Sequence, residues 1–274
     1  MSSTDADRHP PTALIVGASR GLGHAMAAEL FDRGWNVIGT VRDATARTLL
    51  HDLADRSDGR VSVEHLDINE PTQLAPLHER LAPRTLDVLF VNAGTTNNEP
   101  TPIGAVPTAD FVDVMVTNAL SPMRVIEALE DLVSPTGLIG AMSSGQGSIT
   151  NNTTASREVY RGSKAALNMF LRGFSVRQVQ QHESRRAFVL MAPGWVGTAL
   201  GDRTRHSPST RASRGWWTFC CRGWGSPVSR IWIASVRPSH GEPHPGGDTG
   251  APLSPPRWRR LPVRSPAGSV RLAC

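Results

Sequence analysis

The sequence has no cysteine before Cys220, and only one tyrosine and one lysine among its 274 residues. It also lacks any apolar run of the ~18–20 residues that a membrane span needs. A body without cysteine excludes a disulfide framework and is typical of a reducing compartment. The polar first residues, M-S-S-T-D-A-D-R-H-P-P, match neither a signal peptide nor a transit peptide. We therefore expect a cytoplasmic protein with no membrane partner.

The positive charge of the chain is concentrated in its last quarter. Residues 1–202 hold 17 basic and 22 acidic residues, a net charge of −5, whereas residues 203–274 hold 12 arginines and 2 acidic residues, a net charge of +10. The overall charge of +5 would otherwise suggest a nucleic-acid partner. The tail has no lysine and no alternation of basic and aromatic residues, so we expect none.

Short apolar runs alternate with longer segments of helical spacing through the first 200 residues. The runs cover residues 12–16, 36–41, 61–66, 86–91, 138–142 and 187–191, and the helical segments cover 22–33, 44–53, 73–81, 109–132 and 163–180. This alternation predicts an α/β fold with a doubly wound, Rossmann-like parallel sheet. Ligands bind at the carboxyl ends of such strands, so the residues that follow each strand are the candidates for a site.

A glycine-rich turn, G-A-S-R-G-L-G, follows the first strand and opens a helix. Gly17, Gly21 and Gly23 permit a tight turn in which backbone N–H groups approach a pyrophosphate at the helix N-terminus. Ser19 and Leu22 belong to the same turn and are predicted to contact the cofactor with it. Such turns also occur for packing alone, but the strand before and the helix after favour dinucleotide binding.

Charged residues near this turn indicate which dinucleotide binds. Arg20 lies inside the turn and Arg42 follows the second strand in G-T-V-R-D, where two guanidiniums suit the 2′-phosphate of NADP. The arginines could instead be solvated, and Asp43 could hold the ribose hydroxyls of NAD. We predict NADP, with NAD possible. After the third strand, Asp67 and Ile68 are predicted to contact the adenine, with a helix N-cap as the alternative role of Asp67.

The only tyrosine and the only lysine stand four residues apart in Y-R-G-S-K-A-A-L-N, on one face of a predicted helix. Chance would place two unique residues at that spacing in roughly one case in a hundred. A phenol with a free pKa of ~10 is a poor acid at neutral pH, and a nearby ammonium favours the phenolate. Tyr160 and Lys164 are therefore the predicted acid–base pair. The plain alternative is a half-buried tyrosine and a surface lysine.

With this pair, the chain resembles the short-chain dehydrogenase/reductases over residues 12–202. The family's tyrosine–lysine motif falls on Tyr160 and Lys164, and its glycine motif on the turn that begins at Gly17. The remaining matches are N-A-G at Asn92, Ala93 and Gly94, the helix asparagine at Asn118, the serine at Ser144, and P-G at Pro193 and Gly194. The stretches S-S-x-x-G-S-I, Y-R-x-S-K-A-A-L-N-M and P-G-W-V-x-T are similar to the C-factor group of single-domain reductases.

The resemblance implies an NAD(P)(H)-dependent oxidoreductase that reduces a ketone or aldehyde to an alcohol. Tyr160 would protonate the carbonyl oxygen that Ser144 also holds, Lys164 would lower the pKa of the phenol, and Asn118 would position a relay water. Two alternatives stay open: Ser143 could point inward in place of Ser144, and Asn118 could only bond a bent helix. The cofactor contacts implied are Asn92, Ala93, Gly94, Pro193, Gly194, Val196, Thr198, Tyr160 and Lys164.

The expected partner is thus a small-molecule carbonyl compound, and no metal site is expected. Two other interpretations remain: a dinucleotide-binding signalling or regulatory protein of the C-factor type, and an inactive, truncated or frameshifted product. The resemblance also implies a homo-oligomer for an intact relative. For this chain the expectation is weaker, because its last quarter departs from the family pattern.

Residues 203–274 hold all three cysteines, five of the seven tryptophans and ten prolines, with no helical or strand period. Trp, Cys and Phe codons all begin with T, so the neighbouring reading frame turns the stretch from Trp216 to Trp224 apolar at six places. In that frame it can be read as a helix that ends at a glycine. We therefore expect a reductase domain, 1–202, and an irregular basic tail, 203–274, produced by a frameshift or simply disordered. The last helix, the edge strand and the usual subunit interface would then be missing.

Overall fold

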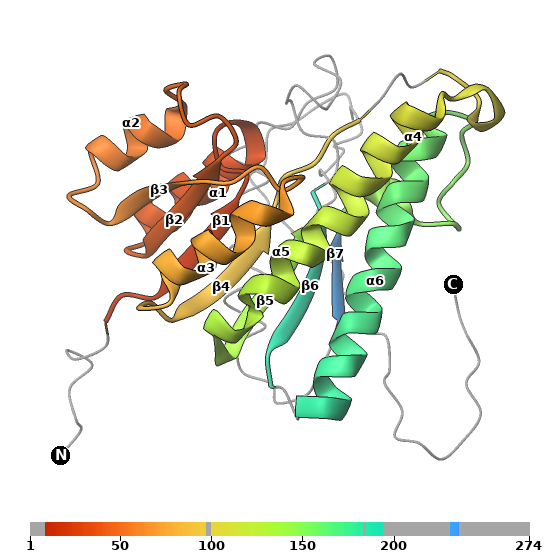
Figure 1. Ribbon diagram of the computed structural model, residues 1–274. Coiled ribbons are helices and arrows are strands. Elements are labelled where there is room, and N and C mark those ends of the chain that lie inside the picture. Colours follow the sequence, from red (N-terminus) through yellow and green to blue (C-terminus); the bar gives the residue numbers. More distant parts are fainter. Residues whose placement is uncertain (1–8, 97–99, 183–184, 194–230, 236–274) are drawn as a thin grey trace, which may run out of the picture.

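The computed structural model describes residues 9–96, 100–182, 185–193 and 231–235. A seven-stranded sheet with the order β3-β2-β1-β4-β5-β6-β7 forms the centre, and all of its neighbouring strands run parallel. Helices lie on both faces of the sheet (Figure 1). The chain winds outward from β1 in one direction and then from β4 in the other, so the predicted doubly wound α/β sheet is confirmed.

Six strands fall on the apolar runs of the sequence. They are β1 (Thr12–Val16), β2 (Asn36–Val41), β3 (Val61–His65), β4 (Leu86–Val91), β5 (Val133–Met142) and β6 (Ala187–Ala192). The strand β5 begins at Val133 rather than at 138, because its first residues pair with β4 while Pro135 and Thr136 remain exposed. An apolar run marks only the part of a strand that is buried on both faces.

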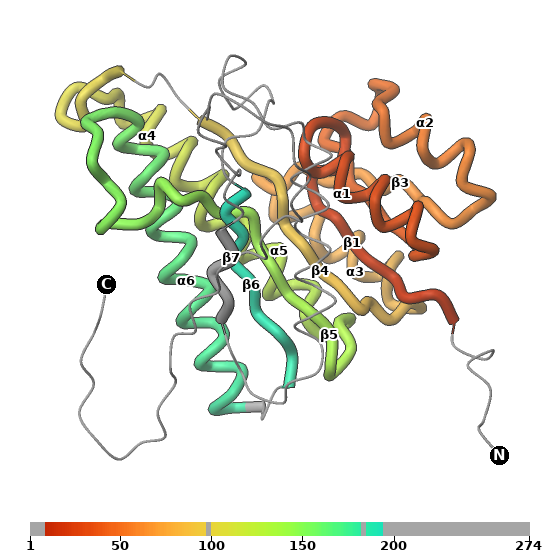
Figure 2. Tube along the Cα trace, turned by 180° about the vertical axis from the view of Figure 1, so that it is seen from behind, coloured from red at the N-terminus to blue at the C-terminus, as the bar shows by residue number. Residues whose placement is uncertain are grey.

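The sheet separates two cores. On one face pack α3 (Leu74–Leu81), α5 (Ser121–Leu129) and α6 (Glu158–His182); on the other pack α1 (Gly21–Asp32) and α2 (Leu49–Asp55), which lie toward the viewer in Figure 2. Alternate residues of β1 divide between the two cores: Leu14 and Val16 join the first, and Ala13 and Ile15 the second. Burial on both faces explains why the strands read as continuous apolar runs.

The single helix predicted over 109–132 is divided. It begins as α4 (Thr108–Met115), passes through a π-helical turn, η4 (Val116–Leu120), and continues as α5 and a short 3-10 turn, η5 (Glu130–Leu132). Pro122 has no N–H with which to make the regular α-helical bond to the carbonyl of Asn118. The irregular turn therefore coincides with the residue that the sequence singled out, as is frequent for π-turns at functional sites.

A seventh strand, β7 (Ile231–Ser235), pairs in parallel with β6 from Phe188↔Ile231 to Ala192↔Ser235. The expectation of a sheet that lacks its edge strand is therefore wrong. The run I-W-I-A is short and stands among arginine, serine and proline, so its pattern alone did not identify it as a strand. The rest of the tail and the boundary at 202 lie outside the described residues.

Close packing across the sheet generates a stability prediction. A Cβ on Gly140 of β5 would lie 2.6 Å from Cδ2 of the buried Phe90 ring and 3.2 Å from the Val189 carbonyl oxygen. Gly140→Ala should therefore destabilise the protein by about 1–3 kcal/mol. Gly173→Ala, at an exposed position inside α6 with open space around it, should stabilise by about 0.5–1 kcal/mol. Urea unfolding of both variants measures the two signs, and equal shifts would contradict this packing.

Candidate active site

The glycine turn has the conformation that its residues allow. Gly17 and Gly21 have φ values of +85° and +60°, and a Cβ on Gly23 would lie 2.1 Å from the carbonyl oxygen of Gly17. The N–H of Gly17 donates to Oγ1 of the buried Thr40 at 2.9 Å, which ties the turn to β2. Any side chain at Gly23 would force the turn apart, so the backbone remains open to a close ligand.

The N-A-G segment after β4 contacts this glycine turn through a hydrogen bond and through packing. The Asn92 side-chain amide donates to the carbonyl oxygen of Gly17 at 2.9 Å. The Ala93 methyl lies 2.9 Å from the position of a Cβ on Gly17. The amide of Asn92, predicted to flank the cofactor ribose, is thus engaged in holding the glycine turn. Gly94 lies nearer the predicted catalytic residues, since a Cβ there would be 3.1 Å from Asn118 Oδ1 and 3.5 Å from Lys164 Nζ.

The start of α1 fits the pyrophosphate of a dinucleotide. Its N-cap residue, Arg20, is extended and makes no side-chain capping bond, and the first turn carries no acidic residue. The first N–H groups of a helix have no partner within it and favour an anion. Ser19 and Leu22 are half-buried beside this helix start. The residues present therefore fit a phosphate-bearing cofactor.

Two exposed arginines flank the same turn, Arg20 at the start of α1 and Arg42 after β2. The neighbouring carboxylate is already engaged: Oδ1 of Asp43 accepts from the N–H of Thr45 at 2.8 Å and from its hydroxyl at 2.7 Å. These hydrogen bonds from Thr45 hold the pKa of Asp43 below its usual value. The two arginines are therefore more available to bind the 2′-phosphate of NADP than Asp43 is to bind the ribose hydroxyls of NAD.

The loop after β3 carries the predicted adenine contacts. Asp67 does not cap a helix, because the N-cap positions nearby are Glu70 and Gln73. Its Oδ1 instead accepts from the N–H of Asn69 at 2.9 Å in a local turn. The helix-cap alternative for Asp67 is therefore wrong. Ile68 is buried and packs in the core on the α3 face.

The predicted acid–base pair lies at the start of α6, beside the carboxyl end of β5. Lys164 is only 4% exposed, and its Nζ donates to the carbonyl oxygen of Met142 at 2.9 Å. The same nitrogen lies 5.7 Å from the centroid of the half-buried Tyr160 ring. Burial lowers the pKa of Lys164 to about 8. The alternative of a surface lysine is thereby excluded.

The two serines after β5 have different surroundings. Ser143 is buried, and its hydroxyl donates to Oδ1 of Asn168 at 2.6 Å. Ser144 is half-exposed, and its Oγ accepts from the N–H of Gln146 at 3.2 Å, at the start of the 3-10 turn η6 (Gly145–Gly147). The Ser144 hydroxyl thus keeps its hydrogen for another acceptor, which favours Ser144 over Ser143 as the group that meets a substrate.

Asn118 is fully buried in the π-helical turn, and its side chain joins two other elements. Its Oδ1 accepts from the N–H of Thr95 at 2.8 Å, while its Nδ2 donates to the carbonyl oxygen of Thr95 at 2.9 Å and to Ser163 Oγ at 3.0 Å. The side-chain amide therefore fastens the N-A-G loop to α6. The bonds of Asn118 to Thr95 and Ser163 could not be predicted from the sequence, because nothing in the spacing of the three residues relates them.

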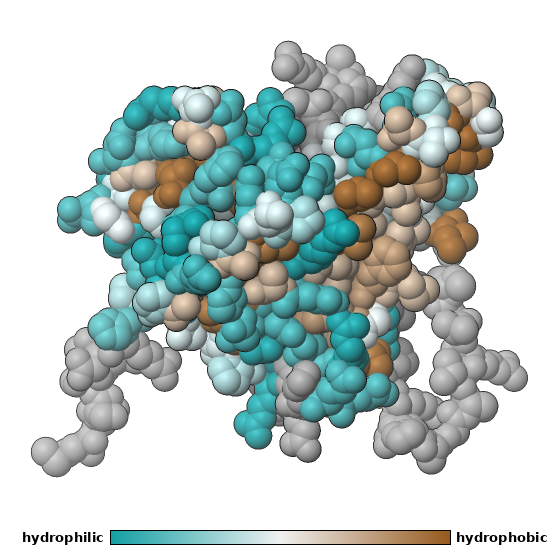
Figure 3. Space-filling model, in the orientation of Figure 1, coloured by the Kyte–Doolittle hydropathy of each residue, from teal (hydrophilic) through white to brown (hydrophobic). Residues whose placement is uncertain are grey.

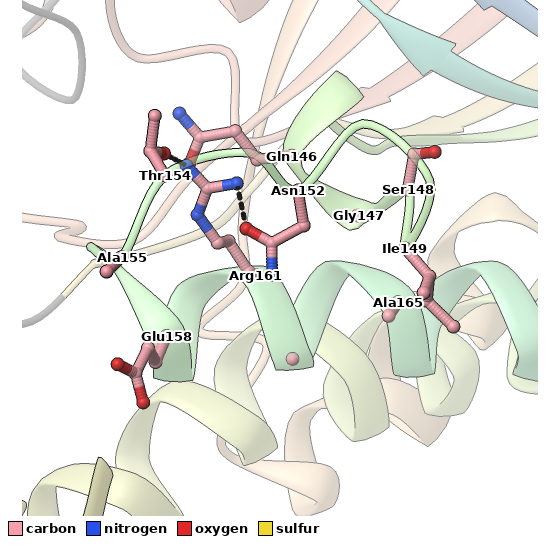
Figure 4. Close-up of a pocket in the computed structure, with 11 residues that line it drawn as sticks. Gln146, Gly147, Ser148, Ile149, Asn152, Thr154, Ala155, Glu158, Arg161 and Ala165 are labelled. Atoms are coloured by element: carbon pink, nitrogen blue, oxygen red, sulfur yellow. Dashed lines mark hydrogen bonds between the residues drawn. The ribbon is translucent and has the colours of Figure 1, made fainter. Parts of the chain in front are cut away.

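A cavity of about 370 Å³ separates α6 from the loop that follows Ser144 (Figure 4). Arg161 holds this loop: it donates to the carbonyl oxygen of Ser156 at 2.6 Å and to Asn152 Oδ1 at 2.8 Å, and it also bonds the Thr154 hydroxyl. Gln146 lines the cavity, and its buried Oε1 has no hydrogen-bond partner within the described part of the chain. The cavity therefore offers polar groups close to the predicted catalytic serine.

The remaining predicted cofactor contacts divide at the end of β6. Pro193 follows that strand and is half-buried. Gly194, Val196 and Thr198 lie outside the described residues. Within the described ranges, no three His, Cys, Asp or Glu side chains gather so that they could hold a metal ion. No helix there has the length and apolar character that a membrane span requires.

Comparison with known proteins agrees with this geometry. The model of the short chain dehydrogenase family matches residues 11–209, which is most of the chain. The chain therefore belongs to the short-chain dehydrogenase family, and the predicted family and enzyme class are confirmed.

Particular relatives share both sequence and fold. The structure of a short-chain dehydrogenase/reductase from Burkholderia multivorans with bound NADP is 51% identical, with a TM-score of 0.78 over 83% of this chain and 96% of that one. A carbonyl reductase from Pseudomonas aeruginosa PAO1 in complex with NADP is 27% identical, with a TM-score of 0.72 over 82% and 96%. The C-signal protein of Myxococcus xanthus is 34% identical over 132 residues, which are 47% of this chain and 77% of the relative.

The buried lysine generates a prediction on pH. Between pH about 8 and about 10.5 an unfolded lysine is still protonated while Lys164 in the folded protein is not, so unfolding takes up a proton. The free energy of unfolding should therefore rise with pH in this window, by at most ~1.4 kcal/mol per pH unit. Lys164→Met should flatten this rise. Urea unfolding of both chains at several pH values measures the difference, and equal slopes would show that Lys164 is not buried as a neutral amine.

Proposed function

We propose that the protein is an NADP-dependent reductase that converts a small ketone or aldehyde to an alcohol. The observation that carries the proposal is the pairing of the only tyrosine, half-buried, with the only lysine, buried, at the carboxyl end of β5, which Ser144 follows. A lysine ammonium costs free energy to bury, and a chain that merely packs a helix there has no need of it. The names of the Burkholderia and Pseudomonas relatives support the same class of reaction.

The chemistry divides among four side chains. The nicotinamide cofactor, when bound, supplies a hydride to the carbonyl carbon. The hydroxyls of Ser144 and Tyr160 hold the carbonyl oxygen, and the phenolic proton moves from Tyr160 to that oxygen. The Lys164 ammonium favours the phenolate that remains, which lowers the pKa of the acid toward neutral pH. Asn118 joins the N-A-G loop to α6 and so keeps these groups at fixed positions relative to one another. By its resemblance to the family, we also assign it the position that holds a relay water.

Cofactor contacts are proposed along the same edge: the turn at Gly17, Ser19, Gly21, Leu22 and Gly23, the Asp67–Ile68 loop, and Asn92 to Gly94. The 2′-phosphate of NADP would meet Arg20 and Arg42. Gln146 and its cavity would receive the remainder of the substrate, with Oε1 accepting from a hydroxyl or N–H group.

Tyr160→Phe tests the reaction. The substitution removes the acid and leaves the ring, so reduction of a panel of aldehydes and dicarbonyl compounds should fall at least ~100-fold. Binding of NADPH, followed by its fluorescence, should change less than about twofold, because the phenol acts on the substrate. Thr150→Ala, an exposed position in the loop before α6, is the control. Turnover of Tyr160→Phe near the rate of the unchanged protein would remove Tyr160 from the mechanism.

Arg42→Ala tests the cofactor. Loss of one charge-assisted contact to the 2′-phosphate should weaken NADPH by about tenfold and leave NADH nearly unchanged. Arg47→Ala removes an equal charge from the same loop, but there the guanidinium is paired with Asp52 and Asp55. Titrations of both cofactors into the three proteins give the ratio of affinities. A ratio that is the same for all three would disprove the assignment of Arg42.

A dinucleotide-binding regulatory protein is the second candidate, favoured by the similarity to C-signal. Such a protein needs the glycine turn but not the phenolic acid. The same Tyr160→Phe variant distinguishes the two candidates. A regulatory protein would bind NADPH without reducing carbonyl compounds, and the substitution would leave that binding unchanged.

The oligomeric state belongs to the same proposal. Large apolar side chains are exposed on α4 and α6, among them Phe111, Met169 and Phe170, and Figure 3 shows apolar surface gathered over these helices. The residues of this face all come before residue 203, so the altered sequence of residues 203–274 leaves this face unchanged. We propose that two copies of the chain pair through it.

Phe170→Glu should therefore convert a dimer to a monomer in light scattering after gel filtration. Phe170 is 47% exposed on α6, and a carboxylate there cannot be buried without a partner. Leu49→Glu, at an equally exposed position on α2, should leave the dimer intact. An unchanged chain that is monomeric throughout the accessible concentration range would contradict the pairing.

A further inference from the structure

The helix α6 holds the turn of the predicted catalytic serine at three points. Lys164 Nζ donates to the carbonyl oxygen of Met142, two residues before Ser144. One helical turn later, Oδ1 of Asn168 accepts the Ser143 hydroxyl at 2.6 Å, and its Nδ2 donates to the carbonyl oxygen of Gly147 at 3.4 Å. Asn168 contacts the residues on both sides of Ser144, while within the described part of the chain no hydrogen bond joins Ser144 itself to α6.

The packing around Gly147 shows how closely the turn lies on the helix. A Cβ at this buried glycine would be 2.9 Å from Asn168 Nδ2 and 2.9 Å from the backbone carbon of Lys164. The backbone of the turn is closed by two further bonds, from Gly147 N–H to the Ser144 carbonyl oxygen at 3.0 Å and from Gln146 N–H to Ser144 Oγ at 3.2 Å. Movement of Ser143 or Gly147 would therefore move the Ser144 hydroxyl with them.

We propose that Asn168 is a positioning residue that fixes the Ser144 hydroxyl relative to Tyr160. Both contacts come from the helix that carries Tyr160, so one rigid element sets the distance between the two hydroxyls that are to hold one carbonyl oxygen. The inference rests on the proposed reductase function. A displacement of about 1 Å in such a pair costs on the order of 100-fold in rate. Asn168 touches no reacting atom and acts only through the turn.

Asn168→Ala should lower kcat for carbonyl reduction by about 10- to 100-fold and leave the Kd of NADPH within about twofold. The pH at which kcat is half-maximal should stay in place, because the variant removes no ionisable group and leaves Tyr160 and Lys164 paired. Ser143→Ala breaks the same bond from the other end and should give the same pattern. Arg172→Ala, exposed one turn further along α6, is the control.

A double-mutant cycle with Ser144→Ala decides whether the effect passes through the serine. Residues that act as one unit are non-additive, so Asn168→Ala should cost less than about threefold once Ser144 has lost its hydroxyl. The full 10- to 100-fold loss in that background, or a shifted pH profile, would overturn the proposal and assign Asn168 a general structural role.

Hydrogen exchange makes the result independent of the reaction. The N–H groups of Gln146 and Gly147 are protected by bonds to Ser144, so Asn168→Ala should speed their exchange at least about tenfold without changing exchange in β1 or β4. Faster exchange together with the absence of any carbonyl reduction by the unchanged chain would reject the reductase function and keep the anchoring. Unchanged exchange in Asn168→Ala would reject the anchoring itself.

Discussion

The ammonium group of Lys164 donates to the Met142 carbonyl oxygen in a place that water hardly reaches, and the geometry of the site depends on this bond. A buried cation without an acceptor would cost several kcal/mol, so α6 has to lie against the carboxyl end of β5. That contact brings Tyr160, one turn earlier on the helix, to the edge where β1 and β4 also end. The bond does not fully offset the loss of water around the ammonium, and the pKa of Lys164 is therefore lowered.

Three asparagine amides extend the same contact into a connected frame. Asn92 holds the glycine turn after β1, Asn118 joins the loop after β4 to α6, and Asn168 joins the turn after β5 to α6. Asn118 and Asn168 each engage both the oxygen and the nitrogen of the amide with groups of another element, and Asn92 engages its nitrogen, so these bonds satisfy polar groups that the loops bury. The loops that carry the site are therefore fixed by side chains from neighbouring segments rather than by regular secondary structure.

Much of the fold and the position of the site could be predicted from the sequence, and the features that could not be predicted have physical causes. The bounds of β1 and β4 follow from apolar runs with sharp polar ends, and the predicted site residues that are described do meet at one edge because parallel strands end there. The roles of Asn92 and Asn118 could not be foreseen, since their partners are 75 and 23 residues away in the chain. The strand β7 was missed because five residues among arginines and prolines carry too little pattern.

The burial of the only lysine also shapes how the protein meets reactive molecules. Aldehydes and ketones form Schiff bases with lysine amines. Here the one lysine amine in the chain is buried, and the other 28 of its 29 lysine and arginine residues are arginines, whose guanidinium stays protonated and is a poor nucleophile at neutral pH. A carbonyl compound that reaches this molecule therefore finds no lysine amine to modify before it reaches the site itself.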